Sequence, residues 1–311
     1  SSTGKFFIQN LRESGDGTSS MCEWCMKHGA GGKWYMNAKN YSNELAKELD
    51  LERYLTEQWS MFETVFVRKF MGGLVSSSGL GYKMSLPIIG RLLRYEAENM
   101  IHSESKNRNA LRADGHFGQV VPLEDAKLIL ANLAAEPIIE NYCMCRVMQR
   151  GVKEVCCVNF GVLSGVIEKL PRFIPKNTKL RLDREEAIAR LEEHNHAGKV
   201  ATVWFQPVPY VNAICSCESP QCGGLRLRTD FGLKAVYKAE YVIGLDIDKC
   251  QGCKECISMC QFGALKYSPS LKRVLVDPKK CFGCGLCRHA CGFDALQLRP
   301  REEVPGLKGQ Y

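Results

Sequence analysis

The residues best suited to chemistry are two copies of one cysteine pattern in the last quarter of the chain. The first copy comprises Cys250, Cys253, Cys256 and Cys260, and the second comprises Cys281, Cys284, Cys287 and Cys291. Both copies have the spacing C-x2-C-x2-C-x3-C, in which a tight loop presents three soft thiolates and the fourth sulfur reaches a neighbouring cluster. This spacing predicts two 4Fe-4S clusters side by side, which would transfer single electrons.

The segment from Tyr241 to Leu298 resembles the bacterial two-cluster ferredoxins. The resemblance implies two crossed ligand sets, one of Cys250, Cys253, Cys256 and Cys291 and the other of Cys281, Cys284, Cys287 and Cys260. The family's proline after each fourth cysteine is replaced by Gln261 and Gly292. Each replacement restores a backbone N–H, so we expect a less rigid turn at both positions.

Apolar segments flank each cysteine run, as they do in that family. The segments Tyr241–Asp248 and Arg273–Asp277 are expected strands that lead into the two runs, and Phe262–Leu265 and Phe293–Leu296 follow them. A disulfide framework would need an oxidising compartment, and zinc motifs are usually C-x2-C pairs separated by a longer loop. Clusters are therefore favoured over both alternatives.

Composition bounds the rest of the chain. The 311 residues can hold two or three domains, and nine of the 17 cysteines lie outside the two runs. The formal net charge is +8, but two oxidised clusters with their thiolates would remove roughly half of that excess, at about −2 each. Because the sequence contains no run of lysines and arginines typical of a nucleic-acid arm, we expect no nucleic-acid binding.

The longest uncharged stretches predict no direct membrane insertion. Met71–Tyr82 is rich in Gly and Ser, and Val200–Cys217 is broken by prolines, whereas a span needs about twenty mainly apolar residues. We find no secretory signal near Ser1. The sequence therefore predicts a cytoplasmic protein in a reducing, anaerobic setting, in which cysteines are thiols or ligands.

A separate C-x2-C pair, Cys22 and Cys25, lies near the start of the sequence. Haem attachment is not expected, because Met26 stands where the motif requires histidine. The spacing allows zinc, a redox thiol pair, half of a cluster site, or two buried thiols. Glycines and aromatic residues around Trp34 favour a cofactor or metal about as much as simple packing.

Seven further cysteines lie in the middle of the chain: Cys143, Cys145, Cys156, Cys157, Cys215, Cys217 and Cys222. They could meet to hold a third iron-sulfur cluster, bind zinc, or be core thiols. A Cys-x-Cys-Arg motif followed by a cysteine-rich loop is also similar to a group of anaerobe iron-sulfur proteins, in which a histidine precedes the later loop. Here Ala201 stands at that place, and His194 and His196 are expected to be exposed at a helix end.

These patterns predict an α+β chain with a largely helical N-terminal region, a mixed α/β cysteine-rich middle domain and a ferredoxin-like C-terminal domain. The expected divisions are a mobile arm over 1–20, a mainly helical region over 21–118, the middle domain over 119–238, the two-cluster domain over 239–298 and a tail over 299–311. Helices are expected over Asn43–Phe70 and Asp183–His194, and a strand over Val200–Phe205.

The leading functional prediction is an iron-sulfur electron-transfer protein, a subunit of an anaerobic oxidoreductase that docks a redox partner or catalytic subunit. No acid, base or nucleophile constellation is visible in the sequence. One alternative is a redox enzyme whose upstream cysteines hold an open-site cluster or other cofactor fed by the ferredoxin domain. The least favoured is a redox-sensing DNA-binding regulator, because acidic residues on the helix over Asp183–His194 would repel phosphate.

Overall fold

The computed structural model describes residues 22–60, 79–102, 118–169, 179–205, 207 and 209–311. The mobile arm expected over 1–20 lies outside these ranges, as do residues 61–78 and 103–117 of the region expected to be mainly helical. The described residues contain both helices and strands, in agreement with the α+β prediction. No described helix is long and apolar enough to cross a lipid bilayer.

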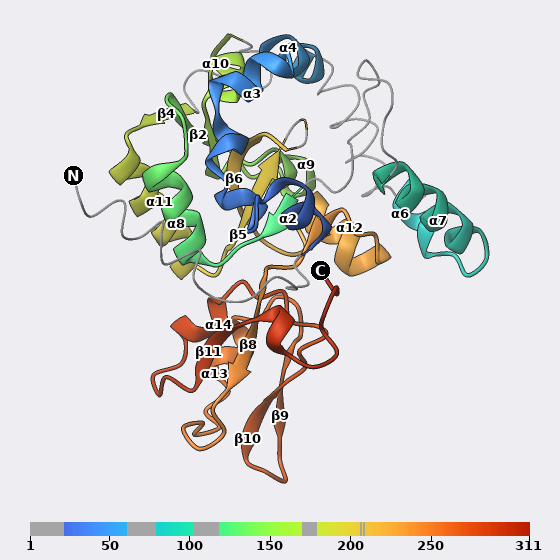
Figure 1. Cartoon of the computed structure of the whole chain (residues 1–311). Helices are drawn as coiled ribbons and strands as arrows, with labels where there is room; N and C mark the ends of the chain where they lie inside the picture. The colour runs from blue at the N-terminus through green and yellow to red at the C-terminus, as the bar shows by residue number, and fades with distance from the viewer. Residues whose placement is uncertain (1–21, 61–78, 103–117, 170–178, 206, 208) are drawn as a thin grey trace.

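A seven-stranded sheet lies at the centre of the larger part of the molecule (Figure 1). Its strands are β1 Gly118–Val120, β2 Ile138–Tyr142, β3 Val155–Phe160, β4 Lys179–Leu182, β5 Val200–Phe205, β6 Val211–Cys217 and β7 Val236–Tyr237. They lie in the order β4-β2-β3-β6-β5-β1-β7, and all neighbours are antiparallel except β1 and β7. The strand expected over Val200–Phe205 is therefore present as β5.

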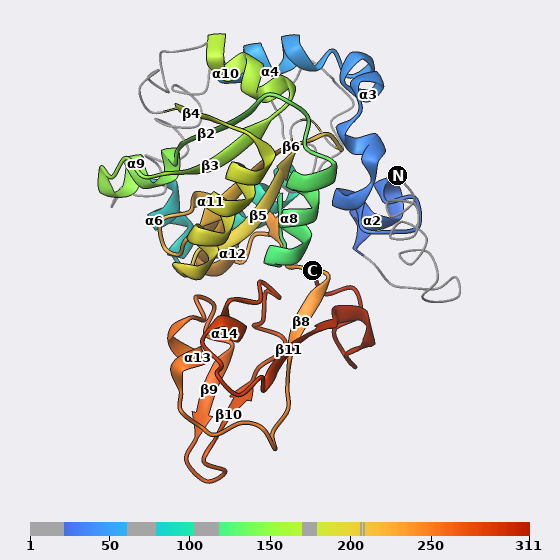
Figure 2. The ribbon, with the colours of Figure 1, turned by 90° about the vertical axis from the view of Figure 1, so that its left-hand side faces the viewer.

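Two helices, α8 (Leu123–Asn132) and α11 (Arg184–His196), cover one face of this sheet (Figure 2). Asp183 caps α11, because its carboxylate accepts from the Glu186 N–H while the Glu186 side chain accepts from the Asp183 N–H. The apolar face of β5 and β6 packs against these helices, and Val203 and Ile214 are fully buried there. This packing fixes the register of the central strands.

Other helices pack around the opposite face and the ends of the sheet. They are α9 (Met144–Arg150), α10 (Val162–Lys169), α12 (Gly223–Phe231), α3 (Asn43–Glu48) and α4 (Leu51–Ser60). The last two replace the first part of the single helix expected over Asn43–Phe70. The chain bends between them at Asp50, whose φ of 47° is left-handed, and residues 61–78 lie outside the described ranges.

The N-terminal described segment contains α2 (Glu23–His28), the short 3-10 helices η1 (Trp34–Met36) and η2 (Ala38–Tyr41), α6 (Leu80–Ser85) and α7 (Ile89–His102). Trp34 and Tyr35 are fully buried against the same core as α8 and α11. In contrast, α6 and α7 project from the body (Figure 1), with Ile88 exposed in the turn between them and Leu92 and Tyr95 exposed on α7.

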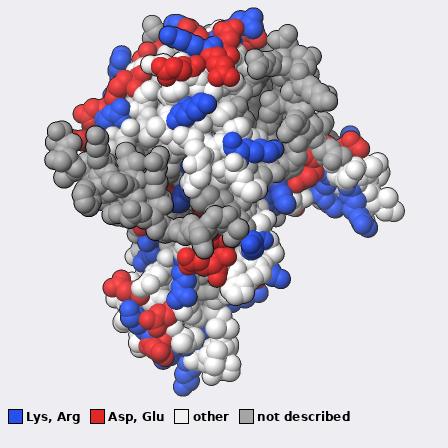
Figure 3. Space-filling model, viewed as in Figure 1, with Lys and Arg blue, Asp and Glu red and all other residues white. Residues whose placement is uncertain are grey.

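The C-terminal unit lies beneath the sheet-containing part (Figure 1). It contains β8 (Tyr241–Leu245) paired with β11 (Leu296–Pro300), β9 (Leu265–Ser268) paired with β10 (Arg273–Val276), and the short helices α13 (Glu255–Ser258) and α14 (Leu286–His289). In the view of Figure 3, basic and acidic side chains are interspersed over this unit.

Arg301 lies in η5 (Arg301–Glu303), within the segment expected as a tail, and bonds to the residues where the chain enters this unit. Its side chain is fully buried, and its guanidinium donates to the carbonyls of Ala239 (2.8 Å), Tyr241 (2.8 Å) and Cys281 (2.9 Å). Burial lowers the pKa of Arg301. These bonds connect η5 to the residue before Glu240, to the first residue of β8 and to the first cysteine of the second run.

His194 and His196 occupy different environments at the end of α11. The prediction that both are exposed is wrong for His194, which is buried with its Nε2 2.8 Å from Glu140 Oε1. Residues two apart on a helix do not share a face, so His196 is exposed while His194 points into the core. Glu140 is fully buried on β2, and a buried carboxylate needs such partners.

Candidate metal centres

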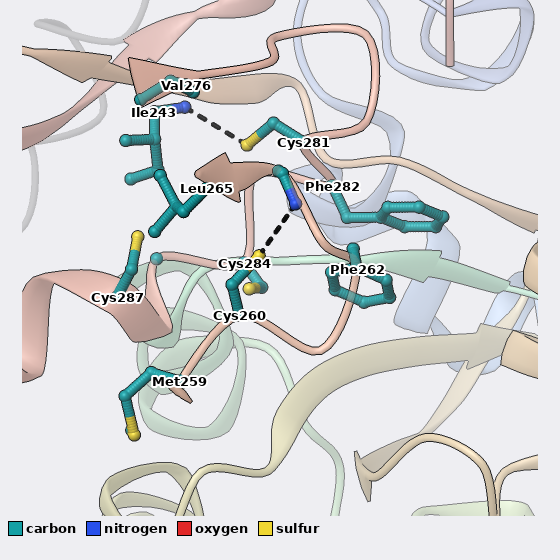
Figure 4. A pocket seen from close by; sticks show the side chains of 12 residues that line it. Ile243, Met259, Cys260, Phe262, Leu265, Val276, Cys281, Phe282, Cys284 and Cys287 are labelled. Atoms are coloured by element: carbon teal, nitrogen blue, oxygen red, sulfur yellow. Dashed lines mark hydrogen bonds between the residues drawn. The ribbon is translucent and has the colours of Figure 1, made fainter. Parts of the chain in front are cut away.

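The first cavity of the C-terminal unit lies between β8, β9, β10 and the second cysteine run (Figure 4). Four cysteines line it: Cys260, Cys281, Cys284 and Cys287. Apolar side chains, among them Ile243, Leu265 and Val276, form the rest of the wall. One cysteine of the first run thus lies with three of the second, the composition that a crossed ligand set requires.

A second cavity has the complementary composition. It is lined by Cys250, Cys253, Cys256 and Cys291, together with the apolar side chains of Leu245, Val274, Phe293 and Leu296. Cys253 is exposed, whereas Cys256 is buried, so this cavity lies close to the surface. Four thiols around an apolar hollow fit a 4Fe-4S cluster at each position.

Backbone N–H groups point at the sulfurs of the first cavity. Ile243 and Gly283 each donate to Cys281 Sγ at 3.4 Å, and Ala264 donates to Cys260 Sγ at 3.3 Å. Gly283 permits this turn, since its φ is +71° and a Cβ would lie 2.1 Å from the Tyr241 carbonyl. Such hydrogen bonds stabilise the anionic form of a cluster and tune its potential.

Burial makes it costly for these thiols to ionise, unless a bound metal ion compensates the negative charge. It raises the pKa of Cys284 to about 12 and that of Cys256 to about 11. A coordinating thiol is deprotonated outright by the metal's charge. The cavities are therefore better suited to metal-bound thiolates than to free ones.

Gln261, which stands where the ferredoxin family has proline, connects the two parts of the molecule. Its Nε2 donates to the Gly198 carbonyl, and its Oε1 accepts from the Ser219 N–H at 2.7 Å. A proline could make neither bond. At the equivalent position of the second run, Gly292 has no neighbour within 4 Å of where a Cβ would lie.

The seven middle cysteines converge on one place, which we call the seven-cysteine site. Six of them form an open series of sulfur contacts in the order Cys217, Cys222, Cys145, Cys143, Cys157 and Cys215. The seventh, Cys156, contacts Cys143 and Cys157, and these three sulfurs lie within 4.8 Å of one another. Hydrogen bonds from neighbouring thiols lower the pKa of Cys143 well below its usual value.

Strand register and a bulge explain how the sheet gathers these residues. Cys157 pairs directly with Cys215 across β3 and β6, and Cys217 lies two residues further on the same face. Asn141 pairs with Cys157 while Tyr142 pairs with Val155, so Cys156 is the extra residue of a bulge. A bulge redirects a side chain, which allows consecutive cysteines to approach the same group.

Helix ends and a buried cation complete the surroundings of the seven-cysteine site. Cys222 caps α12, with its Sγ 3.5 Å from the Leu225 N–H, and Cys145 lies in the first turn of α9. Arg146 is 3% exposed and its Nη1 lies 3.4 Å from Cys156 Sγ. It also pairs with Glu154 and Glu218. A buried positive charge beside thiolates favours their ionised, metal-binding form.

A shared apolar cluster connects the seven-cysteine site with the first cavity. It contains buried Cys217 and Cys222 and is contacted by Cys284 and Phe262. Phe262 stacks on Phe282, with ring centroids 3.9 Å apart and an interplanar angle of 14°. The first cavity is thus continuous in packing with the seven-cysteine site, and the second cavity faces outward.

Cys22 and Cys25 do not join that site. Their sulfurs lie 3.2 Å apart, and Cys25 Sγ is 3.0 Å from Glu240 Oε1. Sequence reasoning did not select Glu240, which directly precedes β8 and is 215 positions from Cys25. Its only local signal is a charge directly before an apolar strand.

Comparison with known families agrees with the C-terminal geometry. Residues 249–295 match the family described as the 4Fe-4S dicluster domain. No curated protein matches the chain. The chain therefore contains an iron-sulfur, ferredoxin-like domain near its C-terminal end, and this domain supports a role in electron transfer.

Proposed function

We propose that this chain relays single electrons between a redox partner at its surface and a third iron-sulfur centre at the seven-cysteine site. The observation that carries this proposal is the convergence of those seven thiols next to the first cavity. In the proposed order, electrons pass from the second cavity to the first and then to the upstream centre. The reverse direction uses the same route.

Two clusters account for the C-terminal cysteines. We assign one cluster to Cys250, Cys253, Cys256 and Cys291 and the other to Cys281, Cys284, Cys287 and Cys260. Each set lines its own apolar cavity, and N–H donors accompany the inner set. When bound, a cluster supplies one-electron chemistry, while the protein supplies ligands, hydrogen bonds and a low-dielectric surrounding.

The third centre rests on ligand supply and charge. A 4Fe-4S cluster needs four soft ligands, and the seven-cysteine site offers more than that number. Arg146 lies against Cys156 and would offset part of the negative charge of a thiolate-bound cluster. The stacked pair of Phe262 and Phe282 lies between this site and Cys284 in one continuous apolar cluster.

A relay is favoured over an open-site enzyme. With seven thiols available, every iron of one cubane can take a cysteine ligand, which leaves no position for substrate. An enzyme with an open-site cluster at these cysteines remains the alternative, and a DNA-binding regulator ranks below it. A small ligand such as cyanide should change the spectrum of an open-site cluster at these cysteines. It should leave the spectrum of a fully cysteine-ligated relay cluster unchanged.

The proposed partner is a redox protein or catalytic subunit of an anaerobic oxidoreductase in the cytoplasm. Cys253 is exposed at the second cavity and marks the point of electron entry. Exposed apolar residues on α7 and in the turn before it, notably Leu92 (64% exposed) and Ile88 (84%), support docking to another protein chain.

The test is iron quantitation with EPR on the full chain purified without oxygen. About twelve irons and three reducible centres are expected, whereas about eight irons would remove the third centre from the proposal. Cys143→Ser and Cys215→Ser should each abolish one centre and leave the two ferredoxin signals. Unchanged iron content in both variants would contradict the assignment.

A matched variant separates the two parts of the proposal. Cys284→Ser should alter a ferredoxin signal while the upstream signal keeps its line shape. Loss of all signals in every cysteine variant would instead indicate general misfolding, and far-ultraviolet circular dichroism of the same samples would reveal it. Rapid reduction of the third centre should fail in Cys284→Ser if the first-cavity cluster is its electron donor.

A further inference from the structure

Three buried ligand-type groups meet at a second place, away from the ferredoxin cysteines and the seven-cysteine site. Cys22 is 2% exposed, Cys25 is 1% and Glu240 is 8%. One sulfur or oxygen from each lies within 4.8 Å of the others. These groups come from the start of α2 and from the residue before β8, so the site joins the first described helix to the start of the C-terminal unit.

The backbone around the two thiols is arranged for anionic sulfur. The Cys25 N–H lies 3.4 Å from Cys22 Sγ, and the Trp34 N–H lies 3.5 Å from Cys25 Sγ. Both N–H groups are donors aimed at a sulfur. Hydrogen bonds of this kind favour a thiolate over a thiol.

The carboxylate of Glu240 is held by a chain of side-chain hydrogen bonds. Trp34 Nε1 donates to Gln119 Oε1, so the Gln119 amide must turn its Nε2 toward Glu240 Oε1, at 3.1 Å. The phenol of Tyr311 also hydrogen-bonds Glu240 and lies near Cys22. Outer groups that fix a ligating carboxylate in this way are characteristic of metal sites.

The buried carboxylate of Glu240, next to two thiols, would be stabilised by a bound cation. Within the described ranges, no lysine or arginine forms a salt bridge with Glu240: the buried Arg301 interacts with it only at longer range, and Lys33 pairs instead with Asp125 at 2.9 Å. A buried carboxylate beside two buried thiols is costly without a counter-charge.

We propose that Cys22, Cys25 and Glu240 bind one Zn²⁺ ion that ties α2 to the entry of the ferredoxin unit. Cysteine thiolates and carboxylate oxygens are both zinc ligands, whereas a cubane would require four thiolates. The phenol of Tyr311 is an oxygen available for the fourth position. With Zn–S bonds of about 2.3 Å, tetrahedral sulfurs stand about 3.7 Å apart, so the two thiols need to separate by roughly half an ångström.

The experiment measures zinc and iron together in the full chain, purified without oxygen from cells grown with zinc. About one zinc per chain is expected, with X-ray absorption at the zinc edge giving two sulfurs near 2.3 Å and oxygen near 2.0–2.2 Å. Cys25→Ser should lower zinc at least tenfold without changing the iron count. Glu240→Gln should weaken retention against a chelator by about 10- to 100-fold.

Two controls keep the outcome distinct from that of the electron-relay proposal. Cys143→Ser should lower iron and leave zinc unchanged, and Glu48→Gln, at an exposed position of α3, should change neither metal. Less than a tenth of a zinc per chain in the unaltered protein would overturn the proposal, even if the variants fold poorly. A zinc shell of four sulfurs, or a Cys22–Cys25 disulfide found by mass spectrometry of anaerobic protein, would also overturn it.

Discussion

Replacing Gln261 with alanine should loosen the contact between the ferredoxin unit and the sheet. The change removes two hydrogen bonds, one to the Gly198 carbonyl and one from the Ser219 N–H. A net hydrogen bond contributes about 0.5–1.5 kcal/mol, so the pair contributes about 1–3 kcal/mol to keeping the surfaces together. Opening at this contact should then become about 5- to 150-fold more frequent, at about 1.4 kcal/mol per factor of ten.

Hydrogen exchange read by mass spectrometry measures this opening directly. The peptide containing Ser219 should exchange faster in Gln261→Ala by a factor within that range, while iron content stays the same. The control is Gln251→Ala in the same cysteine run, because Gln251 is exposed and donates only within its own turn, to the Lys249 carbonyl at 3.3 Å. Equal exchange of the Ser219 peptide in the original protein and in Gln261→Ala would refute the docking role.

Three further substitutions test the packing that positions the candidate sites. Arg301→Met removes three charge-assisted hydrogen bonds. Although the variant also no longer buries a charge, the free energy of unfolding should still fall by about 2–4 kcal/mol. Anaerobic calorimetry should show a lower Tm, which Arg301→Lys restores only in part. Gly283→Ala should lower stability by more than about 2 kcal/mol and reduce iron content, because its Cβ would meet the Tyr241 carbonyl, whereas Gly292→Ala should be nearly neutral; equal effects would contradict this reasoning. Asp183→Ala should cost about 1 kcal/mol through loss of the α11 cap, and unchanged exchange in the first turn of α11 would argue against it.

The cysteine runs and their flanking strands could be predicted because their information is local. The spacing around Cys250 and Cys281 requires a particular loop, and the apolar segments before them form β8 and β10 near the expected bounds. The strand β5 and the helix α11 were equally visible, since hydrophobic alternation and the Asp183 cap lie within a few residues of each element.

The parts that the sequence did not predict depend on contacts between distant segments. The bulge at Cys156 arises from the pairing of β2 with β3, and the burial of His194 on α11 depends on Glu140 in β2. From the sequence, replacement of proline by Gln261 predicted only a less rigid turn. In the structure, Gln261 forms hydrogen bonds with Gly198 and Ser219. No local pattern marks such partners.

The contact between Cys25 and Glu240 also imposes an order on biosynthesis. The two residues are 215 positions apart, and ribosomes add about 5–20 residues per second, so roughly 10–40 s separate their emergence. During that interval the first two thiols are made but lack the carboxylate that meets them in the finished fold. The seven-cysteine site is completed earlier, once Cys222 has emerged, and the ferredoxin cysteines follow last. A cell that loads metals during translation would therefore meet three sets of thiols at different times, and each set could be supplied separately.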